Sequence, residues 1–302
     1  MMVKEINKRH NITFIELSNG SNLRVILSTL GASIVEIYFN NDLLTMSAVN
    51  KDDLERKDVY YGKTIGPICN RIEDGLLVIN SNEYHLPLNE KKACNHSGTN
   101  GLSNKIFNYR YNEDSVEFYL DYEGDLPGKT VFKVVYKLIN NTLRVEYDTV
   151  SNEDTIIALT NHVFFCLGEK GIDNLSLVIP ADYYVKTDQD LIPRSKEKID
   201  DYLDFNKVKK LSSAYDHCYF LKDPKMCCLK SDKYQLTIKS NYECLQIYTD
   251  NFIDDVNVKN TSLKTRRGIA IEPEDSLLNR PIIRSGNHYQ RYIEYIFTCN
   301  GK

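Results

Sequence analysis

A histidine within an apolar stretch is the first residue of this chain that could do chemistry. Residues 159–168, LTNHVFFCLG, place His162 ahead of two phenylalanines, in a chain with 6 histidines among 302 residues. Imidazole has the unperturbed side-chain pKa nearest neutrality, which suits it to proton transfer. Strand alternation puts Thr160, His162 and Phe164 on one face, so an aromatic ring adjoins the imidazole. A structural histidine of the core would show the same pattern, and this stretch leaves both interpretations open.

A glutamate near the C-terminus is the second candidate. In residues 267–281, RGIAIEPEDSLLNRP, Ile269 and Ile271 share one face of a strand and Glu272 lies on the other. We expect Pro273 to end the strand's hydrogen-bond ladder immediately after Glu272. A glutamate on the solvated face of an edge strand is one interpretation. A carboxylate fixed at a strand end in an apolar setting also suits a general base.

Three further motifs hold polar residues in unusual surroundings. Asn70 and Arg71 interrupt the buried pattern of GPICNRI, His96 begins the glycine-containing loop NHSGTNGL, and Asp216 enters the aromatic strand AYDHCYFL. Buried arginines and carboxylates need partners, so Arg71 and Asp216 predict either structural ion pairs or contacts to a ligand. His96 is either a solvated loop residue or a ligand contact, since the glycines let the backbone approach a bound molecule.

Composition and charge exclude several classes of protein. The net charge of −4 and the absence of lysine or arginine blocks make nucleic acid an unexpected partner. No stretch reaches the length of a membrane span, and the charged start MMVKEINKRH does not resemble a signal peptide, so we expect a cytoplasmic protein. The 8 cysteines contain no C-x-x-C pair, which predicts reduced thiols and no zinc site. The Gly-Lys-Thr triplets of YGKTIG and PGKTVF lack the first glycine of a phosphate loop.

The elements that must position these residues are β-strands. Alternation predicts strands in residues 115–122, 234–240, 245–249 and 292–297, and a hairpin over 130–150 that turns at Asn140-Asn141. Another hairpin is expected over residues 12–27, around Asn19-Gly20. Only residues 51–57 and 200–205 suit a turn or two of helix. We therefore predict an all-β fold, a large antiparallel β-sandwich with few short helices, in one domain over residues 1–302.

Taken together, the motifs resemble the aldose 1-epimerase, or galactose mutarotase, family. The matching segments occur in the family's order: GPICNRI, NHSGTNGL, DYEGDLPGKTVFKVVYKL, TNHVFFCLG, AYDHCYFL, QIYTDN and IEPE. The resemblance implies the fold called the galactose mutarotase-like supersandwich and the interconversion of the α and β anomers of a free aldose, with an aldohexose as the expected substrate. It implies that His162 is the general acid and Glu272 the general base. The substrate-binding residues that follow from it are Arg71, His96 and Asp216, with Asn70 of the same motif included.

The predicted reaction fits the residue types. Anomer exchange removes a proton from the C1 hydroxyl, adds one to the ring oxygen, allows rotation about C1–C2 and reverses both transfers. One carboxylate and one imidazole suffice, so no metal or other cofactor is expected, and the expected partner is a small sugar. With such a pair the reaction rate would have a bell-shaped dependence on pH. The rate would fall at low pH as the carboxylate is protonated and at high pH as the imidazolium is deprotonated.

Departures from the family pattern and alternative functions accompany this prediction. Ser97 stands where the family usually has glycine, Phe107 takes the place of a tryptophan, and Glu274 stands where many members have glutamine. The alternatives are a sugar-binding or sensing protein without catalysis, an epimerase acting on a sugar phosphate, and a glycosidase. Arg266-Arg267 would serve the phosphate alternative. Asp216 and Glu272 would form the carboxylate pair of a glycosidase.

Overall fold

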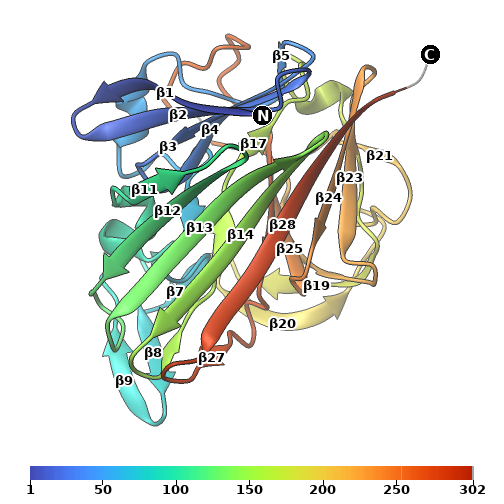
Figure 1. Ribbon diagram of the computed structural model, residues 1–302. Helices are drawn as coiled ribbons and strands as arrows, with labels where there is room; N and C mark the ends of the chain where they lie inside the picture. The colour runs from blue at the N-terminus through green and yellow to red at the C-terminus, as the bar shows by residue number, and fades with distance from the viewer. Residues whose placement is uncertain (253, 301–302) are drawn as a thin grey trace.

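Alternating residues form the longest strands of the largest sheet. The computed structural model describes residues 1–252 and 254–300, and in it β13 (Thr130–Ile139) and β14 (Thr142–Ser151) bury every second side chain. Asn140 takes a φ of 55° at the turn between them. They lie in a nine-stranded antiparallel sheet (Figure 1). In spatial order its strands are β11 (Asn108–Tyr111), β12 (Ser115–Tyr122), β13, β14, β28 (His288–Cys299), β24 (Tyr234–Ser240), β23 (Met226–Lys230), β18 (Ser176–Val178) and β21 (Lys209–Lys210).

Two smaller antiparallel sheets complete the framework. A six-stranded sheet contains β17 (Phe164–Phe165), β26 (Ile269–Glu274), β25 (Cys244–Tyr248), β22 (Asp216–Leu221), β19 (Ala181–Thr187) and β20 (Pro193–Lys198), in that order. A five-stranded sheet contains β1 (Met2–Arg9), β2 (Ile12–Ser18), β3 (Leu23–Ser28), β4 (Ser33–Phe39) and β5 (Asp42–Leu43). The six-stranded sheet is the one that carries the candidate residues Asp216 and Glu272.

Short ribbons and turns connect the sheets. The two-stranded ribbons pair β7 (Arg71–Glu73) with β10 (Ala93–Asn95), β8 (Leu76–Ile79) with β9 (Asn82–His85), β6 (Thr64–Ile65) with β16 (Thr160–Asn161), and β15 (Thr155–Ile156) with β27 (Ile282–Ile283). The short 3₁₀ helices are η1 (Lys51–Glu55), η2 (Gly98–Asn100), η3 (Leu102–Asn104) and η4 (Ile172–Asn174). These connections bring Arg71 and His96 to the six-stranded sheet.

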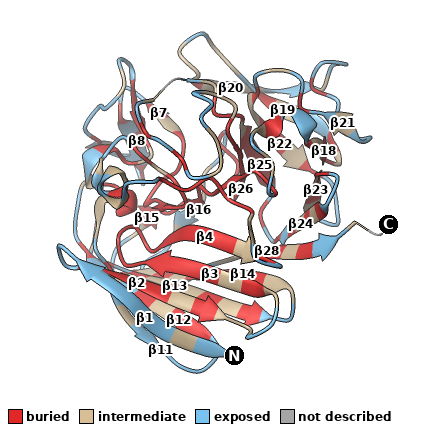
Figure 2. Ribbon diagram, turned by 90° about the horizontal axis from the view of Figure 1, so that it is seen from above, coloured by how far each residue is buried: buried red, intermediate tan, exposed pale blue. Residues whose placement is uncertain are grey.

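The sheets share one apolar core. Its largest cluster of buried side chains combines Val25 of β3, Tyr136 of β13, Phe165 of β17, Ile271 of β26 and Tyr295 of β28. Figure 2 shows the buried residues concentrated in the inner strands, whereas β1 and β11 are largely exposed at the edge. Burial of this apolar surface is the main force that holds the sheets face to face. The predicted all-β sandwich is therefore confirmed.

Two local expectations need correction. Residues 200–205 form a single turn and not a helix. In this turn the Leu203 N–H donates to both the carbonyl and the side-chain carboxylate of Asp200. Strand β26 also continues past Pro273 to Glu274. The carbonyl of Pro273 accepts a hydrogen bond from the Thr160 hydroxyl at 2.8 Å. The N–H and C=O of a strand residue point to the same side of the strand. Proline has no N–H, and in Pro273 that position lies on the side of Thr160, so the hydrogen bonds between β26 and β25 are not interrupted.

The described residues contain no helix that is both long and apolar enough to cross a membrane.

Candidate active site

A cavity of about 300 Å³ lies at the face of β22, β25 and β26. Its volume is at the lower end of the usual range for small-molecule sites. Every residue that the sequence nominated lines it: Asn70, Arg71, His96, His162, Asp216 and Glu272. Segments more than 200 positions apart in the chain thus supply one site.

His162 is held by its backbone and by aromatic packing. It lies between β16 and β17, where its N–H donates to the Lys63 carbonyl at 3.0 Å and its carbonyl accepts from the Gly62 N–H at 2.9 Å. The ring centroid is 5.0 Å from that of Phe164 and 5.8 Å from that of Tyr60. Nδ1 has no hydrogen-bond partner among the described residues. The aromatic neighbour expected on the same face is therefore present.

Glu272 lies beside His162 at the floor of the cavity. Its Oε1 is 3.7 Å from Nε2 of His162, and only 3% of the residue is exposed. β26 has neighbours on both sides, β25 and β17, so Glu272 is not on an edge strand. The hydrogen bond from Thr160 to Pro273 ties the segment before His162 to the residue after Glu272. That bond fixes the imidazole and the carboxylate side by side.

Burial sets the protonation of this pair. It lowers the pKa of His162 to about 4. Burial, then the charges of Glu274 and Asp216, raise the pKa of Glu272 well above its ordinary value. Desolvation disfavours both charged forms, so the order of the two pKa values is opposite to the one expected from the sequence. A single proton shared by the pair is therefore favoured on Glu272, and the His162 imidazole is neutral at pH 7.

His96 is a partly buried residue of the cavity wall and not a solvated loop residue. The backbone N–H of Asn70 donates to its Nδ1 at 3.2 Å, which requires the proton of the neutral ring to be on Nε2. Burial, then repulsion from His162 when that ring is protonated and from Arg71, holds the pKa of His96 well below its ordinary value. Its backbone has a φ of 55°, in the left-handed region. His96 can therefore donate a hydrogen bond to a ligand from Nε2.

Arg71 is held in the cavity wall by an acidic partner. Its Nε and Nη2 donate to the Glu90 carboxylate at 2.7 and 3.2 Å. Asn70 turns the chain at this point with a φ of 62°, and its Oδ1 accepts the Arg71 N–H at 3.1 Å. Nη1 of Arg71 makes no hydrogen bond within the described residues and is available to a ligand.

A hydrogen-bonded chain of side chains crosses the cavity floor. Asn70 Nδ2 donates to Gln246 Oε1 at 3.4 Å, and Gln246 Nε2 donates to Asp216 Oδ1 at 2.6 Å. Gln246 lies directly opposite Glu272 in the pairing of β25 with β26. Burial raises the pKa of Asp216 to about 6, whereas Arg71 and the Gln246 hydrogen bond act in the opposite direction. Asp216 is thus part of the cavity and not of a separate salt bridge.

Several lining residues had escaped the analysis of the sequence. Gln246, Tyr60 and Glu90 line the cavity, and of these only Gln246 carried a signal, as an amide within an otherwise apolar strand. Arg267, in contrast, is fully buried and bonded to Asp250 and Asp254. Arg266 bonds Asp173 and backbone carbonyls. Neither arginine lines the cavity. Arg266 and Arg267, the two cations considered for binding a sugar phosphate, are therefore not available to a ligand there.

The three departures from the family pattern have structural roles. The Ser97 hydroxyl accepts from the Ile68 N–H at 2.9 Å and donates to its carbonyl at 3.0 Å. Phe107 packs in the main core. Glu274 is buried and accepts from the Cys69 thiol at 3.2 Å, and burial raises its pKa to about 7. None of the three lines the cavity, although the charge of Glu274 acts on Glu272.

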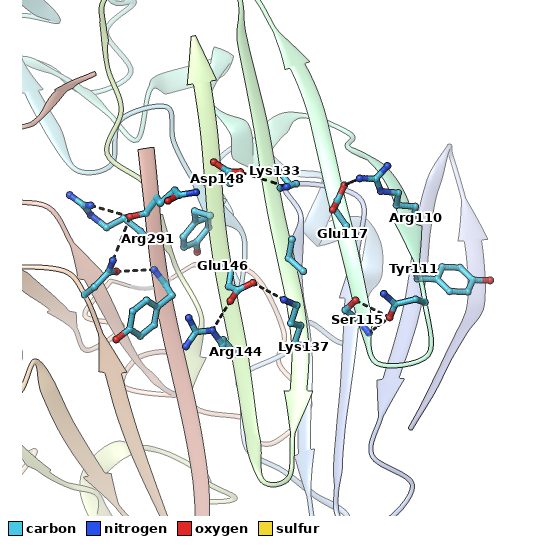
Figure 3. Close-up of a pocket in the computed structure, with 16 residues that line it drawn as sticks. Arg110, Tyr111, Ser115, Glu117, Lys133, Lys137, Arg144, Glu146, Asp148 and Arg291 are labelled. Atoms are coloured by element: carbon cyan, nitrogen blue, oxygen red, sulfur yellow. Dashed lines mark hydrogen bonds and ion pairs between the residues drawn. The ribbon is translucent and has the colours of Figure 1, made fainter. Parts of the chain in front are cut away.

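A larger cavity of about 800 Å³ lies on the outer face of the nine-stranded sheet, where Figure 3 shows its side chains paired across neighbouring strands. Glu117 pairs with Arg110 at 2.6 Å, and Glu146 accepts from Lys137 at 2.9 Å and Arg144 at 2.8 Å. The carboxylates of this cavity are thus neutralised by neighbouring arginine and lysine side chains. None of the nominated residues lies there.

One group of potential metal ligands occurs within the described residues: His10, Asp52 and Glu55. All three are exposed, and none lines the cavity of about 300 Å³.

Comparison with known proteins defines the class to which this fold and site belong. The family model for aldose 1-epimerase matches residues 13–295, so the chain belongs to that family. It is an isomerase that interconverts the anomers of an aldose, and the function predicted from the sequence is confirmed at this level.

Individual relatives agree with this assignment. The chain is 26% identical to galactose mutarotase of Mus musculus, with 80% of each chain covered. It is 27% identical to aldose 1-epimerase of Haemophilus influenzae, covering 94% of this chain and 95% of that one. Among solved structures, an aldose epimerase homologue from C. elegans has a TM-score of 0.88 and 26% identity over 95% of this chain and 99% of that one. A galactose 1-epimerase from Lactobacillus acidophilus has the same fold, with a TM-score of 0.89 at 23% identity and coverage of 99% and 98%.

Proposed function

We propose that Glu272 and His162 carry the two proton transfers of ring opening and closure, on a free aldohexose. Glu272 takes the proton of the C1 hydroxyl as general base, and His162 protonates the ring oxygen as general acid. The observation that carries this proposal is the distance of 3.7 Å between the two side chains within a cavity they both line. The C1 hydroxyl and ring oxygen are bonded to one carbon, so a base and an acid must reach neighbouring atoms.

The protonation of the pair fits a reversible cycle. Opening consumes an ionised Glu272 and a protonated His162 and leaves a protonated Glu272 and a neutral His162. Burial favours the second form, which accompanies the open-chain aldehyde. Rotation about C1–C2 then presents the other face of the aldehyde. In closure His162 takes the proton of the C5 hydroxyl and Glu272 gives its proton to the aldehyde oxygen, which restores both groups. Burial favours the form with a protonated Glu272 and a neutral His162 in the empty site too, so opening begins once the proton of the pair has moved from Glu272 to His162.

Four residues hold the sugar in this proposal. Arg71 and His96 donate to hydroxyl oxygens from Nη1 and Nε2, and Asp216 accepts from hydroxyl groups. Asn70 contributes by its amide and by setting the position of Arg71. The mixture of donors and acceptors suits a polyhydroxylated ligand with both roles on every hydroxyl group.

The alternative functions receive less support. A sugar-phosphate epimerase needs cations at the site, and Arg71 is the one lysine or arginine among the described residues that line the cavity. A binding protein without catalysis would not need an imidazole and a carboxylate held side by side. The curated relatives named galactose mutarotase make galactose a substrate to test first, beside glucose.

A cytoplasmic location is also proposed. The eight cysteines are all free and six of them are buried, which suits a reducing compartment.

Polarimetry tests the proposed function. Freshly dissolved α-galactose and α-glucose should reach anomeric equilibrium faster with micromolar protein, without a shift of the equilibrium itself. Glu272→Gln and His162→Asn should each slow this by about 10²-fold or more, since positioned proton transfer is worth roughly 10²–10⁴-fold. Their circular dichroism should match the wild type.

Matched control variants are available on one exposed hairpin. Glu83→Gln and His85→Asn make the same chemical changes on β9, at exposed residues outside the cavity, and should keep the wild-type rate. If the wild type leaves both relaxations unchanged, the proposed substrate is wrong. If Glu272→Gln keeps most of the rate, the proposed base is wrong.

A further inference from the structure

The pairing of Arg71 with Glu90 has a consequence for which sugars the cavity admits. The Glu90 carboxylate takes two of the guanidinium's donors, at 2.7 and 3.2 Å. It also accepts from Nδ2 of Asn95 at 2.9 Å, which fixes the carboxylate in place. The guanidinium of Arg71, bound through Nε and Nη2, can still donate from Nη1 to a neutral hydroxyl group. Its positive charge, however, is already balanced by the Glu90 carboxylate.

Charges around the rest of the cavity are unbalanced toward negative. Six carboxyl groups line it: Asp58, Glu90, Asp216, Asp250, Asp254 and Glu272. Burial favours the uncharged form of one of them, Glu272. The cations just outside the lining compensate for the others only in part. Arg267 pairs with both Asp250 and Asp254. Arg56 pairs with both Asp58 and the exposed Asp255, and the charge of Lys63 also acts on Asp58.

The neighbouring imidazoles add no positive charge at neutral pH. Burial lowers the pKa of His162 to about 4 and holds the pKa of His96 well below its ordinary value. A ligand in this cavity therefore meets Arg71, already paired with Glu90, as its one lining cation among the described residues.

We propose that Glu90 is a specificity-determining residue: by pairing with Arg71 inside an acidic cavity, it makes the site admit neutral and amino aldoses and reject aldoses that carry a carboxylate or a phosphate. The inference deepens the proposed function, because it names the charge class of the sugar that the same site takes. An anionic group near Arg71 would have to displace Glu90 or lie beside it, and both are unfavourable. An ammonium group meets an unopposed excess of carboxylates.

Glu90→Gln separates this role from simple bracing of Arg71. The amide keeps the size of the side chain and one acceptor for Arg71 but removes the charge. Isothermal titration calorimetry of wild type and variant at pH 7 should use glucose, glucuronate and glucosamine, which present a neutral, an anionic and a cationic group on similar rings. Glu83→Gln on β9 is the control, since it makes the same change at an exposed residue outside the cavity.

Wild-type affinity for glucuronate should be at least about tenfold below that for glucose, because one unit charge near a paired carboxylate costs more than about 1.4 kcal/mol at short range. Glu90→Gln should raise the glucuronate-to-glucose affinity ratio about tenfold and lower the glucosamine-to-glucose ratio. Both effects should shrink in 0.5 M salt as charges are screened. Glu83→Gln should leave both ratios unchanged.

Equal losses for all three sugars in Glu90→Gln would show that Glu90 only braces Arg71, and would overturn the proposal. Wild-type binding of glucuronate as tight as that of glucose would overturn it as well, without any variant. Polarimetry of glucose on the same preparations reports on the proposed function separately. Discrimination by charge without catalysis would refute the proposed function and support the role of Glu90.

Discussion

Gln246 offers a quantitative test of the cavity floor. Its Nε2 donates to Asp216 at 2.6 Å, its Oε1 accepts from Asn70, and it lies opposite Glu272. Gln246→Leu preserves the buried volume and removes the donor. A hydrogen bond to a charged group contributes about 1.5–3 kcal/mol, so kcat/KM should fall by roughly 10- to 100-fold.

The same change should also alter the pH dependence. The Gln246 hydrogen bond opposes the effect of burial, which raises the pKa of Asp216 to about 6. Without the donor the pKa of Asp216 rises further, so the carboxylate is protonated at higher pH. The loss of kcat/KM in Gln246→Leu should therefore be larger at pH 6 than at pH 8.

Polarimetric kinetics on galactose and glucose provide the measurement, with thermal denaturation to confirm the fold. Gln235→Leu on β24 is the matched control, because Gln235 is a half-buried strand glutamine of the nine-stranded sheet, away from the cavity lining. It should keep kcat/KM within about twofold. A folded Gln246→Leu protein with wild-type kcat/KM would refute the reasoning that this amide holds Asp216 for the sugar.

Three further predictions concern the buried charges. Arg267→Met should lower the free energy of unfolding by about 3–5 kcal/mol in urea titrations, because it leaves the buried carboxylate of Asp250 without its cation. Arg266→Met should lower it less, and equal losses would contradict a structural role specific to Arg267. The rate should be bell-shaped in pH, falling on the acid side as His162, with a pKa of about 4, takes a second proton, and on the alkaline side as Glu272 loses the last one. Glu274→Gln removes a charge that raises the pKa of Glu272, so its alkaline limb should move to lower pH in kcat/KM profiles; an unmoved limb would exclude this coupling.

The candidate residues were predictable from the sequence because each combined a polar type with an apolar or glycine-rich setting. His162, Glu272 and Asp216 interrupt strand patterns that burial otherwise explains. Their convergence followed from the family resemblance and not from periodicity, since alternation places a side chain on a face but gives no register between distant strands.

Other features depend on tertiary contacts that no local pattern encodes. Glu90 lies in a charged loop that looks solvated, and only the approach of Arg71 gives it a function. β26 continues through Pro273 because the proline's missing N–H is on the side of Thr160 and not on the side that hydrogen-bonds to β25. The reversed pKa order of His162 and Glu272 depends on burial, which composition does not report.

The most direct test of the central claim is a double-mutant cycle on the catalytic pair. His162→Gln and Glu272→Gln should each lower kcat by about 10²-fold or more in polarimetry at pH 7. Both groups serve the same proton-transfer event, so the double variant should lose far less than the product of the single losses. Losses that multiply, with all three proteins folded, would show that the two residues act independently and would contradict the account.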